Sequence, residues 1–597
     1  MTNSPEIAKL GAEAVRLQRD GQLDDAERLY QHILAEDPHN SEARHMLGVL
    51  RLQQDRAVEA LEILDVLVTE KYATADMRTH HGLVLHALGR NDEALADFER
   101  ALELKPANPM TLLYRGNVLL ALGRAAQALE SYEHLLERIP NYAEAWFRHG
   151  TALWRMERPE AALASYDRAL GFDPGHFEAL FNRGTVLLKL EHYDDAFAAY
   201  EKARALAPNH SHVLGTAASA LLNRCDFARW AEYRDLAVDG VRKGSAVIAP
   251  LTFLPFCDDG ALRRLCSERF AADQVPHPPA PLWTGTRDRH PRIRIAYLSA
   301  DFRQHATAEL IAGLIERHDR ERFEVTAISF GADDSSPMRL RLTKAFDHFL
   351  DVRERGDAKI ARLLREGEFD IAVDLKGHTE SARCGILAHR PCPVQVNYLG
   401  YPGTVAPWLD YVIGDAVALP FDHQPFYSEQ IIHLPHSYQV NDSTRAIPIQ
   451  TLSRNASGLP RDGFVFCCFN AAWKIAPAMF DVWLRLLAAV PGSVLWLLED
   501  NPAMPGNLKH AAAARGVDPA RLVFAPRVPP AEHLARHRLA DLFLDTLPYN
   551  AHTTASDALW AGLPVITCLG AQFDGRVAGS LLHAMGIRVG DAFAWRI

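Results

Sequence analysis

The sequence has few of the features that mark a secreted or membrane protein. Its eight cysteines form no CxxC pair, and several lie inside apolar runs such as GFVFCCFN, so free buried thiols of a reducing compartment are expected. No apolar run approaches the roughly 18–20 residues of a membrane span. Residues 1–20 contain no apolar core of a secretory signal. We expect a cytoplasmic protein without a membrane partner.

Basic clusters and several ligand-binding motifs are also missing. Lys and Arg total 64 against 75 Asp and Glu, a net charge of −11, and form no long block, so a nucleic-acid partner is not expected. Neither GxGxxG nor GxxxxGKS/T occurs, which disfavours a dehydrogenase or a P-loop enzyme. No DxD or HxxxH stands at the end of an expected strand, so no metal or other cofactor is predicted.

What the sequence does contain begins with an internal repeat. Six blocks of 34 residues follow one another, starting at Ile7, Ser41, Ala75, Pro109, Ala143 and Phe177. Position 8 is Gly in five blocks, position 20 is Ala in all six, position 24 is large and mostly aromatic, and position 32 is Pro in five. This is the tetratricopeptide pattern of paired helices.

The residue types at these positions suit two packed helices per block. Small side chains at positions 8 and 20 let the helices approach closely, the large side chain at position 24 fills the space toward the next block, and Pro at position 32 ends the second helix. We predict an all-α tetratricopeptide solenoid over residues 1–210, then a degenerate repeat and helical linker over 211–288. Taken alone, such an array is typical of a protein-binding scaffold.

From about Arg292 short apolar runs alternate with helical patterns. Strands are expected at 292–302, 323–331, 369–377, 392–400 and 409–416, and a second set at 464–470, 493–499, 521–526, 541–546 and 563–567. This alternation predicts parallel, doubly wound α/β sheets. We therefore predict two Rossmann-like lobes, the first over residues 289–450 and the second over 451–597. Ligands of such sheets bind beyond the carboxyl ends of the strands.

Polar side chains follow two expected strands of the second lobe. His552, Thr553 and Thr554 stand at a helix N-terminus, where free N–H groups and the helix dipole favour an anion. Asp557, one turn further, can reach a ribose hydroxyl. Lys474 follows another strand and can stabilise a departing diphosphate. The alternative is an ordinary Thr cap with a first-turn acid and a solvated lysine.

Further candidates follow strands of the first lobe. His305 can act as a general base or orient an acceptor hydroxyl. His378 and the Gly/Pro loop with Gly403 and Thr404 are candidates for the sugar or acceptor side, although a single histidine at a strand end is more often structural. A diphosphate site between two such lobes, without a metal motif, indicates a nucleotide-sugar transferase.

Four segments resemble O-GlcNAc transferase, and more closely its bacterial homologues with tetratricopeptide repeats. The segments are RIRIAYLSADFRQHATAEL, RPCPVQVNYLGYPGTVAPWLDYVIGD, CCFNAAWKIAP and LFLDTLPYNAHTTASDALWAGLPV. The resemblance implies two lobes of the GT-B type and inverting, metal-independent transfer of N-acetylglucosamine from UDP-GlcNAc to Ser or Thr of acceptor proteins. The repeats would bind those proteins, and a homodimer is an expected state.

The resemblance also implies roles for individual residues. His305 corresponds to the active-site histidine, which either takes the acceptor proton or only positions the reactants while a donor phosphate oxygen takes it. Lys474, His552, Thr553 and Thr554 correspond to diphosphate ligands, Asp557 to the ribose-binding acid, and His533 and Arg536 to nucleotide-side residues.

The sequence departs from the family pattern in several places. Ala471 stands where the animal enzyme has a glutamine, Asp370 replaces a second histidine, and NGY reads KGH at residues 376–378. GHT is similar to the plant O-fucosyltransferases, so O-fucosyl, O-glucosyl and N-glucosyl transfer remain alternatives. The acceptor-binding asparagine of the repeats is kept at Asn182 alone, and the C-terminus is shorter than in relatives. A scaffold with a decayed transferase region is the other hypothesis.

Overall fold

The chain forms two compact units, Met1–Leu190 and Glu191–Ile597. The computed structural model describes residues 5–69, 73–286, 289–448 and 453–587. The predicted lobe boundaries at 288 and 450–451 and the predicted shortened end therefore lie at or outside the limits of the described residues. The division between the two units falls after Leu190, inside the sixth predicted repeat.

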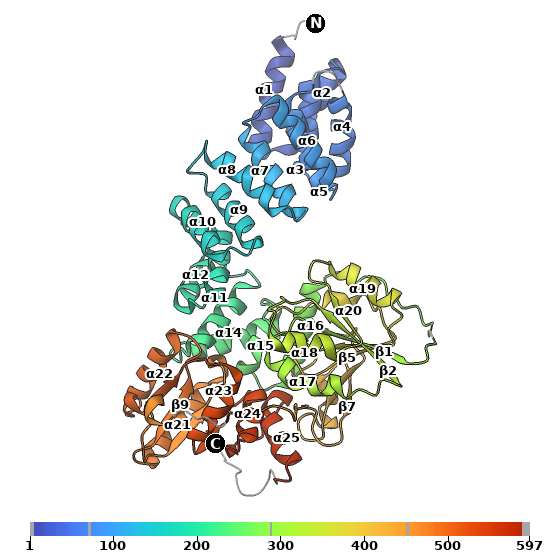
Figure 1. Cartoon of the computed structure of the whole chain (residues 1–597). Coiled ribbons are helices and arrows are strands. Elements are labelled where there is room, and N and C mark those ends of the chain that lie inside the picture. Colours follow the sequence, from blue (N-terminus) through green and yellow to red (C-terminus); the bar gives the residue numbers. More distant parts are fainter. Residues whose placement is uncertain (1–4, 70–72, 287–288, 449–452, 588–597) are drawn as a thin grey trace. The chain divides into compact units, whose positions relative to one another are not determined.

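The first unit is a succession of antiparallel helix pairs (Figure 1). Asparagine or threonine side chains cap several first helices of a pair; the side chain of Asn40, for example, accepts the N–H of Ala43 at 3.0 Å. The helices are α1 (Pro5–Arg19), α2 (Leu23–Glu36), α3 (Ser41–Gln53), α4 (Ala57–Thr69), α5 (Ala75–Ala87), α6 (Asn91–Leu104), α7 (Pro109–Ala121), α8 (Ala125–Leu136), α9 (Ala143–Arg155), α10 (Pro159–Phe172) and α11 (Phe177–Lys189).

The glycine at repeat position 8 meets the large side chain at position 24 of the same repeat. A Cβ added to Gly82 would lie 2.8 Å from Phe98, and one added to Gly150 would lie 2.8 Å from Tyr166. Phe98 also stacks on Tyr114 of the following repeat, with 6.5 Å between ring centroids. The position-24 side chain thus fills the space within its own repeat as well as the predicted space toward the next one.

Five helices open the second unit and lead into its sheets. They are α12 (Tyr193–Leu206), α13 (Val213–Arg224), α14 (Trp230–Lys243), α15 (Pro250–Phe253) and α16 (Gly260–Gln274). Cys225, directly after α13, belongs to the hydrophobic core of the second sheet, and Leu254 and Ala271 belong to a core of the first sheet. The predicted linker is therefore a packed helical segment that contacts both lobes.

The first sheet has seven parallel strands in the order β3-β2-β1-β4-β5-β6-β7. They are β1 (Ile293–Ser299), β2 (Phe323–Ser329), β3 (His348–Asp351), β4 (Ile371–Asp374), β5 (Val394–Asn397), β6 (Tyr411–Gly414) and β7 (Gln430–His433). The helices are α17 (Ala306–Glu316), α18 (Pro337–Ala345), α19 (Asp357–Glu366) and α20 (Gly385–Ala388).

Helices cover both faces of this sheet. Tyr297 of β1 packs in one core with Ile311 of α17, whereas its neighbour Leu298 packs in another core with Ile360 of α19. Adjacent residues of a strand point to opposite faces, and both faces must be buried in a doubly wound sheet. The apolar runs of the sequence follow from this double burial.

The second sheet has five parallel strands in the order β10-β9-β8-β11-β12. They are β8 (Val465–Cys468), β9 (Val494–Leu498), β10 (Leu522–Ala525), β11 (Leu542–Leu544) and β12 (Val565–Ile566). The helices are α21 (Pro477–Ala489), α22 (Ala503–Ala513), α23 (Pro530–Arg536), α24 (Thr553–Trp560) and α25 (Val577–Ala584), with a 3₁₀ turn η4 (Ala472–Lys474) after β8. Figure 1 shows α21, α22 and α23 around β9.

Two features differ from the predicted lobes. The edge strands β3 and β7 were not predicted. Phe573 and Val577, near the start of α25, belong to a core of the first sheet together with Tyr438. The chain thus returns to the first lobe after completing the second sheet.

In both sheets the strand order reverses between the first and the fourth strand along the chain. The reversal lies between β1 and β4 in the first sheet and between β8 and β11 in the second. The loops that follow these strands diverge to opposite faces, which leaves a crevice where ligands of doubly wound sheets bind. These two positions are therefore the places to examine for a site.

The described residues can be searched for disulfides, membrane-spanning helices and metal clusters. The cysteines at 225, 257, 266, 384, 392, 467, 468 and 568 are all free thiols. Within the described ranges, no helix has the length and apolarity needed to cross a bilayer. No set of three or more His, Cys, Asp or Glu in the described parts of the chain is arranged to hold a metal ion.

The packing of Gly82 against Phe98 can be tested by substitution. Gly82→Ala adds a methyl group 2.8 Å from a fully buried ring, and overpacking of this kind costs roughly 1–3 kcal/mol. We expect guanidinium unfolding, followed by circular dichroism, to show the repeat transition at lower denaturant. Gly171→Ala in α10 is the matched control, because no atom lies within 4 Å of its added methyl. Equal effects of the two substitutions would contradict the packing described.

Candidate functional site

The ends of β8 and β11 lie side by side at the reversal point of the second sheet. Phe543 of β11 pairs with Cys467 of β8 in parallel register. Both strands therefore end at the same edge, where the loop 469–476 meets the loop 545–552. Lys474 comes from the first of these loops, and His552, Thr553 and Thr554 follow the second.

Lys474 is held in place by the second loop. Its Nζ donates a hydrogen bond to the carbonyl of Asn550 at 3.0 Å and lies 4.1 Å from the centre of the Tyr549 ring. Burial lowers the pKa of Lys474 to about 8, and nearby Asp545 opposes part of this effect. Asn550 precedes His552 by two residues, so the ammonium and the start of α24 belong to one site.

Asp545 fixes the loop that contacts Lys474. Its buried carboxylate accepts hydrogen bonds from Thr546 N at 2.7 Å, Ala551 N at 2.6 Å and Thr567 Oγ1 at 2.6 Å. Burial raises the pKa of Asp545 to about 7, while these three donors and Lys474 favour the carboxylate. Asp545 was not among the predicted residues, although its place directly after a strand was a usable signal.

His552 stands at the N-cap of α24 as a neutral ring. Its Nε2 donates to the carbonyl of Asp574 at 3.1 Å, and the ring stacks on Tyr549 with 4.7 Å between centroids. Burial and the charge of Lys474 hold the pKa of His552 well below its usual range. The proton on Nε2 leaves Nδ1 as an acceptor, so the neutral ring offers no N–H to an anion.

The two threonines after His552 differ in their contacts. The Thr554 hydroxyl donates to Oδ1 of Asn470, and Nδ2 of Asn470 donates to Thr546 Oγ1 at 2.7 Å. The Thr553 hydroxyl has no hydrogen-bond partner among the described residues. Together with the unpaired N–H groups of the first helical turn, Thr553 supplies donors to a group bound beside Lys474.

His533 and Arg536 of α23 reach the same site through Phe469, the residue that follows β8. The Arg536 guanidinium lies 4.4 Å from the centre of the Phe469 ring, and the His533 ring centre lies 5.4 Å from it. His533 Nδ1 accepts a hydrogen bond from Arg536, and burial lowers the pKa of His533 to about 2. The pair places a neutral ring and a cation against the Phe469 side chain.

Asp557 lies one turn into α24 and is engaged by a residue that sequence reasoning missed. Its Oδ1 accepts a hydrogen bond from Arg445 Nη2 at 2.7 Å. Arg445 comes from the segment that connects the two lobes, 112 residues earlier in the chain. Burial raises the pKa of Asp557, and Arg445 opposes that effect.

His305 caps α17 at the reversal point of the first sheet. Its Nδ1 accepts the N–H of Thr307 at 3.1 Å, so the neutral ring carries its proton on Nε2 and presents a donor. Burial lowers the pKa of His305, and the nearby Asp301 carboxylate, 3.6 Å from Nδ1, opposes this. Asp301 Oδ2 also accepts a 2.6 Å hydrogen bond from Lys376 Nζ, which follows β4.

The other three first-lobe candidates use their polar groups within the protein. His378 is buried between Phe270 and Tyr401 and donates from Nε2 to the carbonyl of Val405 at 2.7 Å. Thr404 donates its hydroxyl to the buried Glu429. Gly403 packs closely against Tyr401, since an added Cβ would lie 2.8 Å from that ring. The polar groups of these residues are therefore used in the packing of the loops after β4 and β5.

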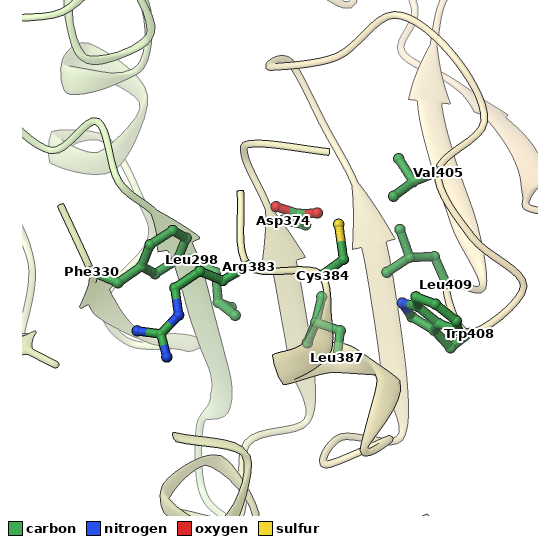
Figure 2. A pocket seen from close by; sticks show the side chains of 9 residues that line it. All are labelled: Leu298, Phe330, Asp374, Arg383, Cys384, Leu387, Val405, Trp408 and Leu409. Atoms are coloured by element: carbon green, nitrogen blue, oxygen red, sulfur yellow. The ribbon is translucent and has the colours of Figure 1, made fainter. Parts of the chain in front are cut away.

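Figure 2 shows a cavity beside the end of β4, lined mainly by apolar side chains around Asp374. Its volume is about 10 Å³, which is close to the least that holds one water molecule. The Asp374 carboxylate accepts the N–H groups of Lys376 at 2.9 Å and Gly377 at 3.2 Å. Asp374 thus shapes the turn that carries Lys376, and the cavity is too small for a sugar.

The two reversal points approach each other across the second unit. Trp473 and Tyr549, which surround Lys474, pack in one hydrophobic cluster with Leu298 of β1 and with Tyr401 and Val405 of the loop after β5. No hydrogen bond or ion pair joins His305 to the Lys474 loop within the described ranges. The contact between these two reversal points is therefore the apolar cluster around Trp473 and Tyr549.

The structure combines a helical repeat array with two parallel sheets, and polar groups lie at the reversal point of each sheet. This is the arrangement predicted for a transferase with two Rossmann-like lobes preceded by repeats. The chain belongs to glycosyl transferase family 41, whose model matches residues 262–451 and 444–591, more than half of the chain. Tetratricopeptide repeat families match residues 17–79, 82–123 and 147–211. The fold predicted from the sequence, a tetratricopeptide solenoid followed by two Rossmann-like lobes, is confirmed.

Named relatives match the same region. The probable UDP-N-acetylglucosamine–peptide N-acetylglucosaminyltransferase SEC of Arabidopsis thaliana is 37% identical over 329 residues, 54% of this chain and 34% of the relative. The UDP-N-acetylglucosamine–peptide N-acetylglucosaminyltransferase of Caenorhabditis elegans is 27% identical over 409 residues, 50% of this chain and 36% of the relative. This chain thus spans about a third of the length of the curated relatives it matches.

A solved structure extends the similarity to the repeats. An O-GlcNAc transferase mutant of Thermobaculum terrenum superposes with a TM-score of 0.55 and 28% identity, covering 80% of this chain and 86% of that one. The similarity therefore includes the order of a helical array and two sheets.

His305 caps α17 in addition to its proposed chemical role, and substitutions can test the two roles separately. His305→Asn keeps a side chain that caps helices well, whereas His305→Ala removes the cap and should lower the unfolding free energy by about 1 kcal/mol. Both substitutions remove the Nε2–H donor. Urea unfolding of the full chain measures the difference, and equal stability of the two variants would show that the bond to Thr307 N contributes nothing.

Proposed function

We propose that this protein is an inverting, metal-independent glycosyltransferase that moves N-acetylglucosamine from UDP-GlcNAc to Ser or Thr hydroxyls of proteins. The observation that carries the proposal is the placement of the Lys474 ammonium beside the N-terminus of α24, at the ends of two adjacent strands. A cation, unpaired N–H groups and a hydroxyl at one point suit a diphosphate. The names of the relatives support UDP-GlcNAc as its source.

The donor nucleotide is held by the second lobe in this proposal. The diphosphate lies at the first turn of α24, where Thr553 and backbone N–H groups donate to it and Lys474 neutralises its charge. His533, Arg536 and Phe469 hold the base. Asp557 accepts hydrogen bonds from the ribose. The negative charge that grows on UDP during departure is then stabilised without a divalent ion.

The transfer step joins the acceptor to the sugar from the face opposite UDP. The acceptor oxygen forms a bond to the anomeric carbon while the bond from that carbon to the phosphate oxygen breaks, and its electron pair leaves with UDP. The acceptor proton passes to a base, for which a donor phosphate oxygen is the proposed site. His305 presents Nε2–H and therefore orients the reactants rather than taking the proton.

The proposal also covers the acceptor proteins, the assembly and the location of the protein. Acceptor proteins bind through the repeats, and a homodimer is a proposed assembly. Free thiols are consistent with a proposed cytoplasmic location. O-Fucosyl or glucosyl transfer and a scaffold without transfer are the alternatives, and nucleotide binding distinguishes them.

Nucleotide binding by Lys474 can be measured through stability. UDP that binds only the folded protein raises its melting temperature. At a UDP concentration of 100 times Kd, the folded state is stabilised by roughly 2.7 kcal/mol. Lys474→Ala should remove most of this shift, because the diphosphate then lies beside no lysine. Lys509→Ala, which removes an exposed lysine of α22, is the control and should keep the shift.

The same experiment separates the alternatives. A larger shift with GDP than with UDP would move the donor toward GDP-fucose, and no shift at millimolar UDP would favour the scaffold. Mass spectrometry of proteins incubated with UDP-GlcNAc should then find a hexosamine on Ser or Thr. Activity that a chelator abolishes would contradict metal independence.

The titration of Lys474 predicts a pH dependence of UDP binding. Its pKa is lowered to about 8 by burial, so the ammonium is present at pH 7 and largely lost at pH 9. If only the charged lysine holds the diphosphate, affinity falls by about tenfold over this range. Lys474→Arg stays charged and should bind equally at both values. Calorimetric titration at pH 7, 8 and 9 checks this, and a parallel fall in the arginine variant would assign the effect to another group.

A further inference from the structure

Arg445 occupies an unusual place in the second unit. It lies in the segment between β7 and the second lobe, yet its side chain is only 8% exposed and meets Asp557, which is 10% exposed. The bond from Arg445 Nη2 to Asp557 Oδ1 is 2.7 Å long. An arginine in a connecting segment is usually solvated, so this burial needs an explanation.

The connecting segment is attached to both lobes just before Arg445 and at the carbonyl of Arg445 itself. The Ser556 hydroxyl of α24 donates to Oδ1 of Asn441, and Trp560 Nε1 donates to the carbonyl of Arg445 at 3.1 Å. On the first lobe, Arg341 of α18 donates to Asp442 at 2.6 Å. These contacts fix the backbone of Arg445 relative to the turn of α24 that carries Asp557.

The Asp557 carboxylate is only partly used by this contact. Oδ1 accepts from Arg445, whereas Oδ2 has no hydrogen-bond partner among the described residues. The only other ion pair of Arg445 that the described residues show is a 3.9 Å contact between its Nε and Oε2 of Glu309 on α17. Without the Arg445 guanidinium, the Asp557 carboxylate would lie near the like charge of Glu309. Its charged form would then be less stable, and no contact would fix the orientation of its two oxygens.

We infer that Arg445 is a positioning residue for nucleotide recognition: it holds the Asp557 carboxylate so that Oδ2 accepts the hydroxyls of a ribose. The inference rests on the proposed function, since it needs a nucleotide at the start of α24. A planar guanidinium fixes the direction of a bound carboxylate and also stabilises its negative charge. The segment that joins the lobes thereby contributes to the nucleotide site of the second.

The test compares UDP with 2′,3′-dideoxy-UDP in calorimetric titrations of the full-length protein. The wild type should prefer UDP by at least tenfold, because a hydrogen bond to a charged group is lost without the hydroxyls. Arg445→Met should weaken UDP by about tenfold while leaving the dideoxy compound nearly unchanged, so the preference disappears. Arg445→Lys should restore part of it. Arg461→Met, which changes an exposed arginine of the second lobe, should leave both affinities unchanged.

A second set of variants tests the inference even if Arg445→Met is unstable. Asp557→Asn and Arg445→Lys/Asp557→Asn should show the same UDP affinity, because residues that act through one another are not additive. An unchanged ribose preference in Arg445→Met or Arg445→Lys, or tighter UDP binding by either, would overturn the inference. A wild type that binds UDP without ribose preference also overturns it, while the proposed function stands. A wild type that binds no UDP overturns both.

Discussion

The site depends on one half-buried ammonium that the protein keeps at the end of a central strand. A lysine removed from water is costly unless other groups replace its hydration. Here the carbonyl of Asn550 and the faces of Tyr549 and Trp473 surround Lys474, and Asp545 stands behind the same loop. The Asp545 carboxylate in turn is stabilised by three donors. The lysine therefore remains charged near neutral pH while staying accessible to an anion.

Contacts from distant parts of the chain hold this arrangement. Ala472, two residues before Lys474, donates its N–H to Asp500 at 2.8 Å and accepts the thiol of Cys225 from the helical segment. His552 is fixed by the carbonyl of Asp574, whose carboxylate forms a buried ion pair with Arg263 of α16. The helices before the sheets and the segment after them thus both support the loops of the second sheet.

The first lobe accommodates the KGH motif, which differs from the family's NGY. KGH in place of NGY puts Lys376 at the end of β4, but its ammonium is paired with Asp301 at 2.6 Å and both are buried. The pair adds no net charge beside His305. His378 of the same motif is enclosed by Phe270 and Tyr401. The departure therefore alters the packing of the strand ends more than the charge offered to a ligand.

The sequence by itself determined the local structure and the residues at strand ends. The spacing of Gly, Ala and Pro defined the repeats, and a doubly buried strand such as β8 is a continuous apolar run, whereas the edge strands β3 and β7 are short and partly exposed and were missed. Lys474 and His552–Thr554 were identifiable because each follows such a run. Only the tertiary structure decided which strand ends are neighbours, since strand order depends on pairing between distant segments. For the same reason Arg445, 112 residues from Asp557, carried no local signal of its partner.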